Sequence, residues 1–284
     1  MKAAQYITIA AAIALIALIY WGGNTIPPAK PMAMKQPAAG GVAQGPGTMK
    51  PASFDSLIAA SKSQLPKTAA DSVKTIENEL SAIRDSSRMA VVFMRLSGVW
   101  ERAGQHIVAN YFTATAAKLE KSQKNLTFAG QYFLELMQSE SSDAVRLWEA
   151  NQAVSCLEQS QEIDPANEDT KLALATAYIE GTGEPMRGVQ ILRDITAQKP
   201  DDIPANMLLG RLSIQSGQLD KAMQRFETVL KADPKNTEAM YFMAQAYEGR
   251  GDKAKAIELL EKCKTLVNDP RFSKDVDEKI KTLK

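Results

Sequence analysis

The chain has 284 residues, of which 45% are hydrophobic and 24% are charged, and its net charge is +1. This composition is ordinary for a globular protein and provides enough material for one or two domains. Because Lys and Arg are not in general excess, the composition argues against a nucleic-acid partner.

Residues 3–21 form an almost continuous apolar run that only Gln5 and Thr8 interrupt. As a helix, this run would be about 28 Å long, close to the thickness of the hydrocarbon core of a bilayer. Tyr6 and Trp21 lie near its two ends, as in an interfacial aromatic belt. We therefore predict a single N-terminal transmembrane helix, a signal anchor at residues 1–21. The alternative is a cleaved signal peptide, although no small-x-small cleavage site follows the run.

The charges beside this run are nearly balanced, because Lys2 precedes it and Lys30 and Lys35 follow it. A very short N-terminal tail usually stays inside, which sends the rest of the chain across. The predicted localisation is therefore the inner (cytoplasmic) membrane, with a single pass and the soluble domain in the periplasm or another extracytoplasmic space.

Residues 22–53 are rich in Pro, Gly and Ala and contain no acidic residue. Such a stretch cannot build a core, so we predict a flexible, disordered linker that would span roughly 30 Å as a coil. The linker is basic, whereas the chain after it is mildly acidic. We interpret it as a passive spacer, with a proline-rich docking segment as the alternative.

Residues 54–167 are predicted to be a helical region with degenerate hairpins. Phe54 begins a series of apolar residues at helical spacing, and Pro66 breaks it. Residues 88–121 and 126–167 read as worn copies of the helix pair that recurs later in the chain. The second helix of the latter copy, from Asp143 to Ile163, is unusually long. Small residues of the first copy are Gly98, Gly104, Ala109 and Ala116.

Residues 168–270 repeat one pattern three times at a spacing of about 34 residues. A helix hairpin of this length cannot bury its apolar face alone, so neighbouring hairpins must stack. Small residues mark the places where two helices cross closely, and prolines follow the helix ends. The copies are Leu174-Ala175, Tyr178, Gly188, Leu192 and Pro200; Leu209-Gly210, Ala222, Phe226 and Pro234; and Met243-Ala244, Tyr247, Ala256, Leu260 and Pro270.

Local signals agree with three helix pairs. Gly217 and Gly251 lie at turns where a left-handed residue is favoured, and Asp202 and Asn236 are suitable N-caps. Residues 271–284 are rich in Lys and amphipathic, which predicts a C-terminal capping helix over the last pair.

This pattern resembles the tetratricopeptide repeat. The resemblance implies an all-α fold, a right-handed superhelix of antiparallel helix pairs. Two departures are visible. The fourth motif position, often aromatic in the family, is Lys171, Asn206 or Met240, and the last proline, Pro270, comes two residues late.

In this family, the first helices of successive repeats line a concave groove that takes a peptide or a helix. Members that clamp acidic C-termini use Lys and Asn there, whereas this chain has Leu172, Met207 and Tyr241, so an apolar or mixed segment is expected. The alternative is that some of these side chains pack between repeats. The predicted groove residues are Leu172, Thr176, Ile179, Met207, Arg211, Ile214, Tyr241, Gln245 and Glu248.

No catalytic pattern is present in the sequence. His106 has no metal-binding partner at helical spacing, Cys156 and Cys263 are far apart, and no Gly-rich phosphate loop occurs. We therefore predict no enzyme activity, no cofactor, no metal and no small-molecule substrate.

The predicted function is that of a non-catalytic, membrane-tethered scaffold or adaptor that mediates protein–protein interactions in the bacterial cell envelope. Its partner would be a protein or peptide segment held in the groove. An accessory factor in envelope protein biogenesis or c-type cytochrome maturation is the main alternative. An enzyme with an unrecognised site is the third hypothesis.

Overall fold

A computed structural model describes residues 50–284, which form thirteen α-helices and, within that range, no strand. The predicted transmembrane run at residues 3–21 and the predicted linker up to residue 49 lie outside the described residues. Among residues 50–284, no helix is both long and apolar enough to cross a bilayer. The predicted domain boundaries and the predicted anchor therefore stay predictions.

Two short helices begin the described part of the chain. Pro66 separates α2 (Phe54–Ser63) from α3 (Lys67–Ala82), as predicted, because proline has no N–H for a helix interior and is the N-cap residue of α3. These helices do not form a hairpin with each other. Instead, α3 packs on α4 (Ser86–Arg102), and α2 packs on α5 (His106–Glu120).

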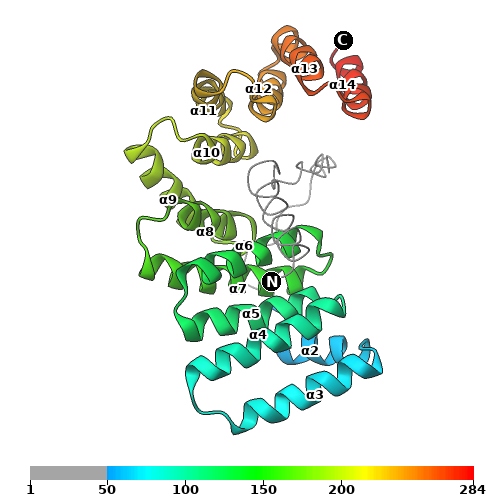
Figure 1. Ribbon diagram of the computed structural model, residues 1–284. Helices are drawn as coiled ribbons and strands as arrows, with labels where there is room; N and C mark the ends of the chain where they lie inside the picture. Colours follow the sequence, from blue (N-terminus) through cyan, green and yellow to red (C-terminus); the bar gives the residue numbers. More distant parts are fainter. Residues whose placement is uncertain (1–49) are drawn as a thin grey trace, which may run out of the picture. The chain divides into compact units, whose positions relative to one another are not determined.

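Five helix hairpins follow, and each is a first helix packed against a second helix (Figure 1). The second helix of each hairpin also packs on the first helix of the next, which is the stacking that the repeat pattern predicts. The two worn copies are hairpins of this kind, and the long helix has the predicted bounds. Beyond α4 and α5, the helices are α6 (Gln123–Ser139), α7 (Asp143–Ile163), α8 (Glu168–Glu180), α9 (Pro185–Gln198), α10 (Ile203–Gln215), α11 (Leu219–Ala232), α12 (Thr237–Gly249) and α13 (Lys253–Val267).

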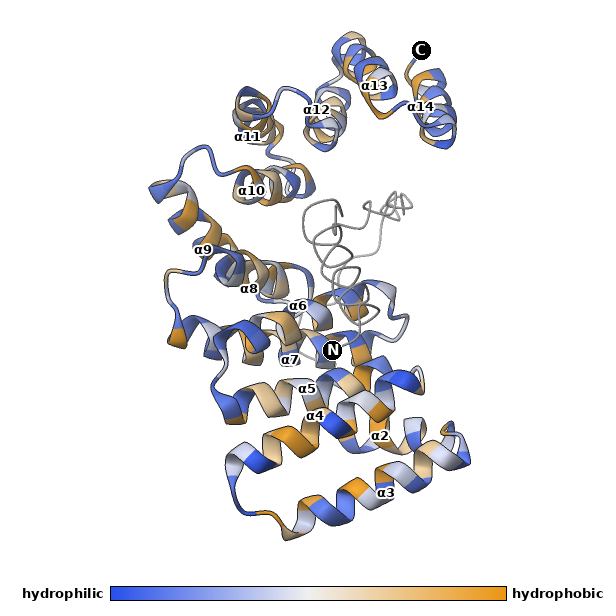
Figure 2. Cartoon of the chain, viewed as in Figure 1, coloured by the Kyte–Doolittle hydropathy of each residue, from blue (hydrophilic) through white to orange (hydrophobic). Residues whose placement is uncertain are grey.

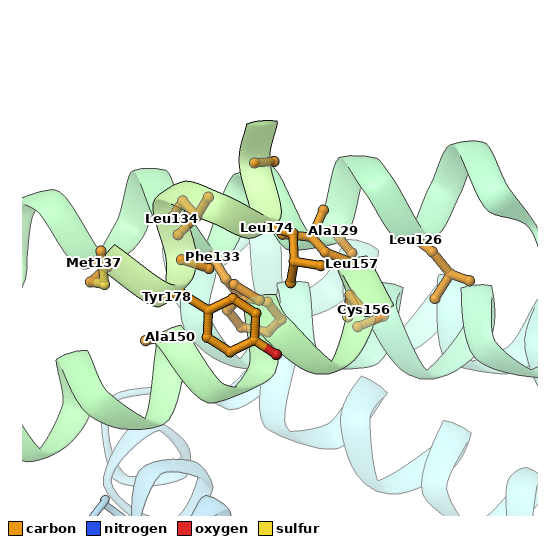
Figure 3. Close-up of a cluster of buried hydrophobic side chains, with 14 of the residues drawn as sticks. Leu126, Ala129, Phe133, Leu134, Met137, Ala150, Cys156, Leu157, Leu174 and Tyr178 are labelled. Carbon is orange, nitrogen blue, oxygen red and sulfur yellow. The ribbon is translucent and has the colours of Figure 1, made fainter. Parts of the chain in front are cut away.

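The core lies between the helices of each hairpin and between neighbouring hairpins. Most helices carry both hydrophilic and hydrophobic residues along their length, as amphipathic helices do (Figure 2). Between α6, α7 and α8, Phe133, Leu157 and Tyr178 are at most 2% exposed and belong to one apolar cluster (Figure 3). Farther along the chain, Leu209 and Met243 are 7% and 8% exposed, so their predicted core positions are confirmed.

The turns confirm several local predictions. Gly217 and Gly251 have φ angles of 71° and 84°, the left-handed region that glycine adopts without strain. Asp202 and Asn236 are the N-caps of α10 and α12.

Two local predictions were wrong. Gly98 is not needed for close packing, because an added Cβ would meet nothing nearer than Arg102 Nη1 at 3.4 Å. Pro270 does not follow the repeat as a stop. It starts α14 (Pro270–Leu283), because Asn268 has already ended α13 in a left-handed conformation with φ 48°.

The helix α14 packs against α13 at the end of the stack. Its residues Val276, Ile280 and Leu283 are at most 4% exposed and join the apolar cluster of Ala256 and Leu260. They recur at helical spacing, so one side of α14 covers the last hairpin.

Candidate functional site

Small residues bring the two helices together in the hairpins α8–α9 and α10–α11. A Cβ at Gly210 would come within 2.6 Å of the buried ring of Phe226, and one at Gly188 within 2.4 Å of the carbonyl oxygen of Ala175. Neither position has room for a side chain, so α10 packs directly on α11 and α8 on α9. The pattern of small residues thus fixes the position of these first helices against their second helices.

The first helices α8, α10 and α12 also begin in the same way. The side chain of the N-cap residue accepts a hydrogen bond from the backbone N–H three residues later. The distances are 2.8 Å for Asn167, 2.8 Å for Asp202 and 2.9 Å for Asn236. The equivalent start gives the three helices a common register, so residues at the same motif position lie one repeat apart.

Along one side of the stack, α6 contacts α8, α8 contacts α10, and α10 contacts α12. A hollow of about 460 Å³ lies on these four first helices, and we call it the groove. Its wall combines apolar side chains with a few polar and charged ones. The lining residues are Gln131, Asp169, Leu172, Ala173, Thr176, Ile203, Pro204, Met207, Leu208, Arg211, Asn236 and Glu238.

Four of the nine predicted groove residues line this hollow, namely Leu172 and Thr176 of α8 and Met207 and Arg211 of α10. Met207 is only 8% exposed and packs in the cluster around Phe226. Its side chain is therefore part of the packed wall of the groove and offers little surface to a ligand. The structure thus brings together predicted groove residues from two successive repeats.

The other five predicted residues do not line the hollow. Ile179 packs beside Gly188, and Ile214 and Tyr241 pack against the apolar clusters that contain Phe226 and Leu260, respectively. Glu248 forms an ion pair with Lys279 of α14 at 2.8 Å, and Gln245 is partly buried on α12. Ile179, Ile214 and Tyr241 therefore fit the alternative interpretation, in which these side chains pack between repeats.

Sequence reasoning missed the residues at the start of each first helix. Asp169, Pro204 and Glu238 hold the same position in α8, α10 and α12, and all three line the groove. Their shared phase was readable in the sequence, because each is the second residue of its helix. Gln131 was missed since residues 126–167 read only as a worn copy.

Charge in the groove is mixed. The guanidinium group of Arg211 lies 3.4 Å from a carboxylate oxygen of Glu180 and 5.6 Å from the ring centre of Phe242. It is therefore held by an ion pair and a cation–π contact. Asp169 and Glu238 are exposed, so the groove has an acidic rim around one positioned cation.

The described residues offer little for catalysis. His106 is exposed, and its Nδ1 lies 2.8 Å from a carboxylate oxygen of Glu101. Both cysteines are free and buried, and burial raises the pKa of the Cys156 and Cys263 thiols to about 11. They stay protonated near neutral pH and are poor nucleophiles. Among residues 50–284, no group of three His, Cys, Asp or Glu side chains could hold a metal ion.

Residues 149–212 and 213–272 match the family model described as tetratricopeptide repeat. Over these residues the chain is similar to tetratricopeptide repeats. The match includes α7 from Glu149 onward and every helix from α8 to α13. The groove therefore lies on the first helices of these repeats and on the neighbouring α6.

Two curated proteins resemble the repeats over short stretches. Anaphase-promoting complex subunit 3 of Dictyostelium discoideum is 33% identical over 84 residues, which cover 30% of this chain and 9% of that protein. Cellulose synthase operon protein C of Escherichia coli (strain K12) is 38% identical over 64 residues, which cover 22% of this chain and 5% of that protein. This chain thus spans less than a tenth of either relative.

Among solved structures, a MamA structure from Desulfovibrio magneticus RS-1 is similar with a TM-score of 0.49 and 18% identity. The match covers 66% of this chain and 98% of that one.

Proposed function

We propose that this protein is a non-catalytic, membrane-tethered scaffold that holds a segment of a partner protein in the groove. The observation that carries the proposal is that first helices of successive repeats share one hollow, with Leu172 and Thr176 from one repeat and Met207 and Arg211 from the next. A ligand lying across both repeats would contact equivalent positions about 34 residues apart in the chain.

The lining chemistry describes the segment that would fit. Leu172, Ile203 and Leu208 provide apolar contact, and Arg211 provides a donor for a backbone carbonyl or a carboxylate. Arg211 already shares its charge with Glu180, so a strongly acidic peptide gains little. An apolar segment with few charges is therefore the expected partner.

Tethering in the cell envelope is the second element of the proposal, and it is supported by the apolar run at residues 3–21. The full-length chain should stay in the membrane pellet after an alkaline carbonate wash, and a chain that starts at Phe54 should be released. A mature N-terminus between residues 20 and 30 would overturn the anchor.

The groove is best tested by photo-crosslinking in membranes. A photoreactive residue in place of Leu208, which lines the hollow, should form a crosslink to one partner protein. The same residue in place of Gln224 of α11 or Lys255 of α13, on second helices, serves as the matched control and should not. Crosslinks of the same partner from the second helices alone would show that binding uses the opposite face.

A further inference from the structure

A second hollow of about 240 Å³ lies apart from the groove and shares no lining residue with it. It is formed where α2, the α4–α5 turn, the end of α6 and the helix α7 meet. We call it the Glu149 cavity. Its lining residues are Ser61, Gly104, Gln105, His106, Ile107, Leu136, Ser139, Glu140 and Glu149.

Glu149 is the unusual member of this wall. Its side chain is 0% exposed, and neither carboxylate oxygen has a hydrogen-bond partner in the protein. Buried carboxylates are normally paired or hydrogen-bonded, because loss of hydration penalises the charged form strongly. Burial and, to a smaller degree, the negative charge of Glu140 raise the pKa of Glu149 to about 8, against the opposing effect of Arg146.

The nearby polar groups do not satisfy this carboxylate. His106 is engaged with Glu101 at 2.8 Å. The Oε1 atom of Glu140 accepts the backbone N–H of Ser142 at 2.7 Å, so Glu140 is held beside the cavity as a second acid. Arg146 contributes attraction but no hydrogen bond, and it lies 3.9 Å from Asp143.

The backbone around the cavity also favours a cation. The helices α2, α4 and α6 end at Ser63, Arg102 and Ser139, close in the chain to lining residues, whereas α5 and α7 begin near it. The C-terminal end of a helix carries partial negative charge. Ile107 and Leu136 add apolar wall beside the acids.

We propose that the Glu149 cavity binds an alkylammonium group, the chemistry of a lysine side chain. The ammonium ion would donate to the carboxylate of Glu149, and its alkyl stem would pack on Ile107 and Leu136. A metal ion is disfavoured, since no trio of metal-binding side chains occurs among the described residues. The site does not depend on the groove or on the proposed function.

The test is calorimetric titration of the full-length chain with n-butylammonium at pH 8. Wild type should bind it and should not bind 1-butanol, which has the same stem without the charge. Glu149→Gln keeps the shape and removes the charge, so it should weaken binding by about 30-fold or more. Glu162→Gln, an exposed change on the same helix, should bind as wild type does.

Unchanged binding by Glu149→Gln, or no binding by wild type, would overturn the site. If Glu149→Gln does not fold, as judged by circular dichroism, Glu140→Gln should still weaken binding, and unchanged binding by that variant would overturn the site. A blocked lysine tripeptide distinguishes the source. Binding of the tripeptide identifies a protein side chain as the ligand, and binding of the free amine alone identifies a small amine.

Discussion

The hairpins α8–α13 and the hairpins α4–α7 reach the same architecture by different contacts. In the later hairpins, first helices of 13 residues meet their partners through small residues at a fixed spacing. In the earlier ones, helices of up to 21 residues surround a group of aromatic rings. Phe54 of α2 stacks on Tyr111 with ring centres 3.6 Å apart and on Trp148 at 6.0 Å.

This difference explains which part of the molecule its sequence reveals. Contacts in the later hairpins are local and recur, so every copy supports the others. The aromatic group joins residues from α2, α5 and α7 that are far apart in the chain and occur once. Such contacts leave no period to detect.

The largest expected effect is a dependence of the unfolding free energy on pH that arises from Glu149, in the earlier hairpins. The native pKa of Glu149 is raised to about 8, well above the value of about 4.3 for an unfolded Glu. Between these values the native state binds the extra proton, so stability is greatest at low pH and falls as pH rises. The slope is about 1.4 kcal/mol per pH unit. Urea unfolding at pH 5 and pH 8 should therefore show a loss on the order of 4 kcal/mol that Glu149→Gln abolishes.

His106, which lines this cavity, and its partner Glu101 are also titratable groups. The matched control is His106→Gln, which should keep the slope if Glu149 is its source. A slope that follows His106 instead would contradict the assignment.

The next effect concerns the later hairpins. Gly188→Ala places a Cβ 2.4 Å from a backbone oxygen of Ala175, and backbone in a helix cannot move aside cheaply. We expect a loss of about 1–3 kcal/mol in unfolding free energy. Lys253→Ala, at an exposed helix start, should cost about 0.5 kcal/mol at most. Equal shifts of the denaturation midpoint for both variants would contradict the packing argument.

Helix caps give a smaller contrast. Asn236→Ala removes the hydrogen bond from the N–H of Ala239 and should cost about 1 kcal/mol. Gln105→Ala is the comparison in the earlier hairpins, because Gln105 precedes α5 without a side-chain cap bond. Its expected effect is about 0.5 kcal/mol or less. Thermal melts of the two variants measure the difference, and a larger loss for Gln105→Ala would reverse the expected order.

The smallest effect is a gain. Gly98 is in the interior of α4, an added Cβ would meet only the end of the Arg102 side chain at 3.4 Å, and alanine is the better helix former. Gly98→Ala should therefore stabilise the chain by up to about 1 kcal/mol. A loss would show that α4 needs glycine for close packing after all.

Most of the repeat architecture could be predicted because its signals are local. The caps Asp202 and Asn236, the turn glycine Gly217 and the crossing at Gly210 each follow from one residue type and its neighbours. The groove was predicted in part. The motif phase identified Leu172 and Arg211, but phase alone does not say whether a side chain such as Met207 packs inward.

Glu149 could not have been found from the sequence. It lies in α7 between Trp148 and Ala150, and a glutamate in a helix is usually solvated. Its burial depends on α2, the α4–α5 turn and α6 closing over it. This burial arises from tertiary contacts between distant elements, and it leaves no pattern in the spacing of residues.

The last helix has a consequence for assembly. Stacked hairpins present an apolar strip at an open end, and another hairpin can add to it. In this chain α14 covers that strip with Val276, Ile280 and Leu283 and turns Lys274, Asp275 and Glu278 to solvent. Burying these charged side chains against a second copy would cost their hydration, so end-to-end stacking on α14 is disfavoured. A chain that ends at Asn268 would expose the apolar surface of the last hairpin and should self-associate.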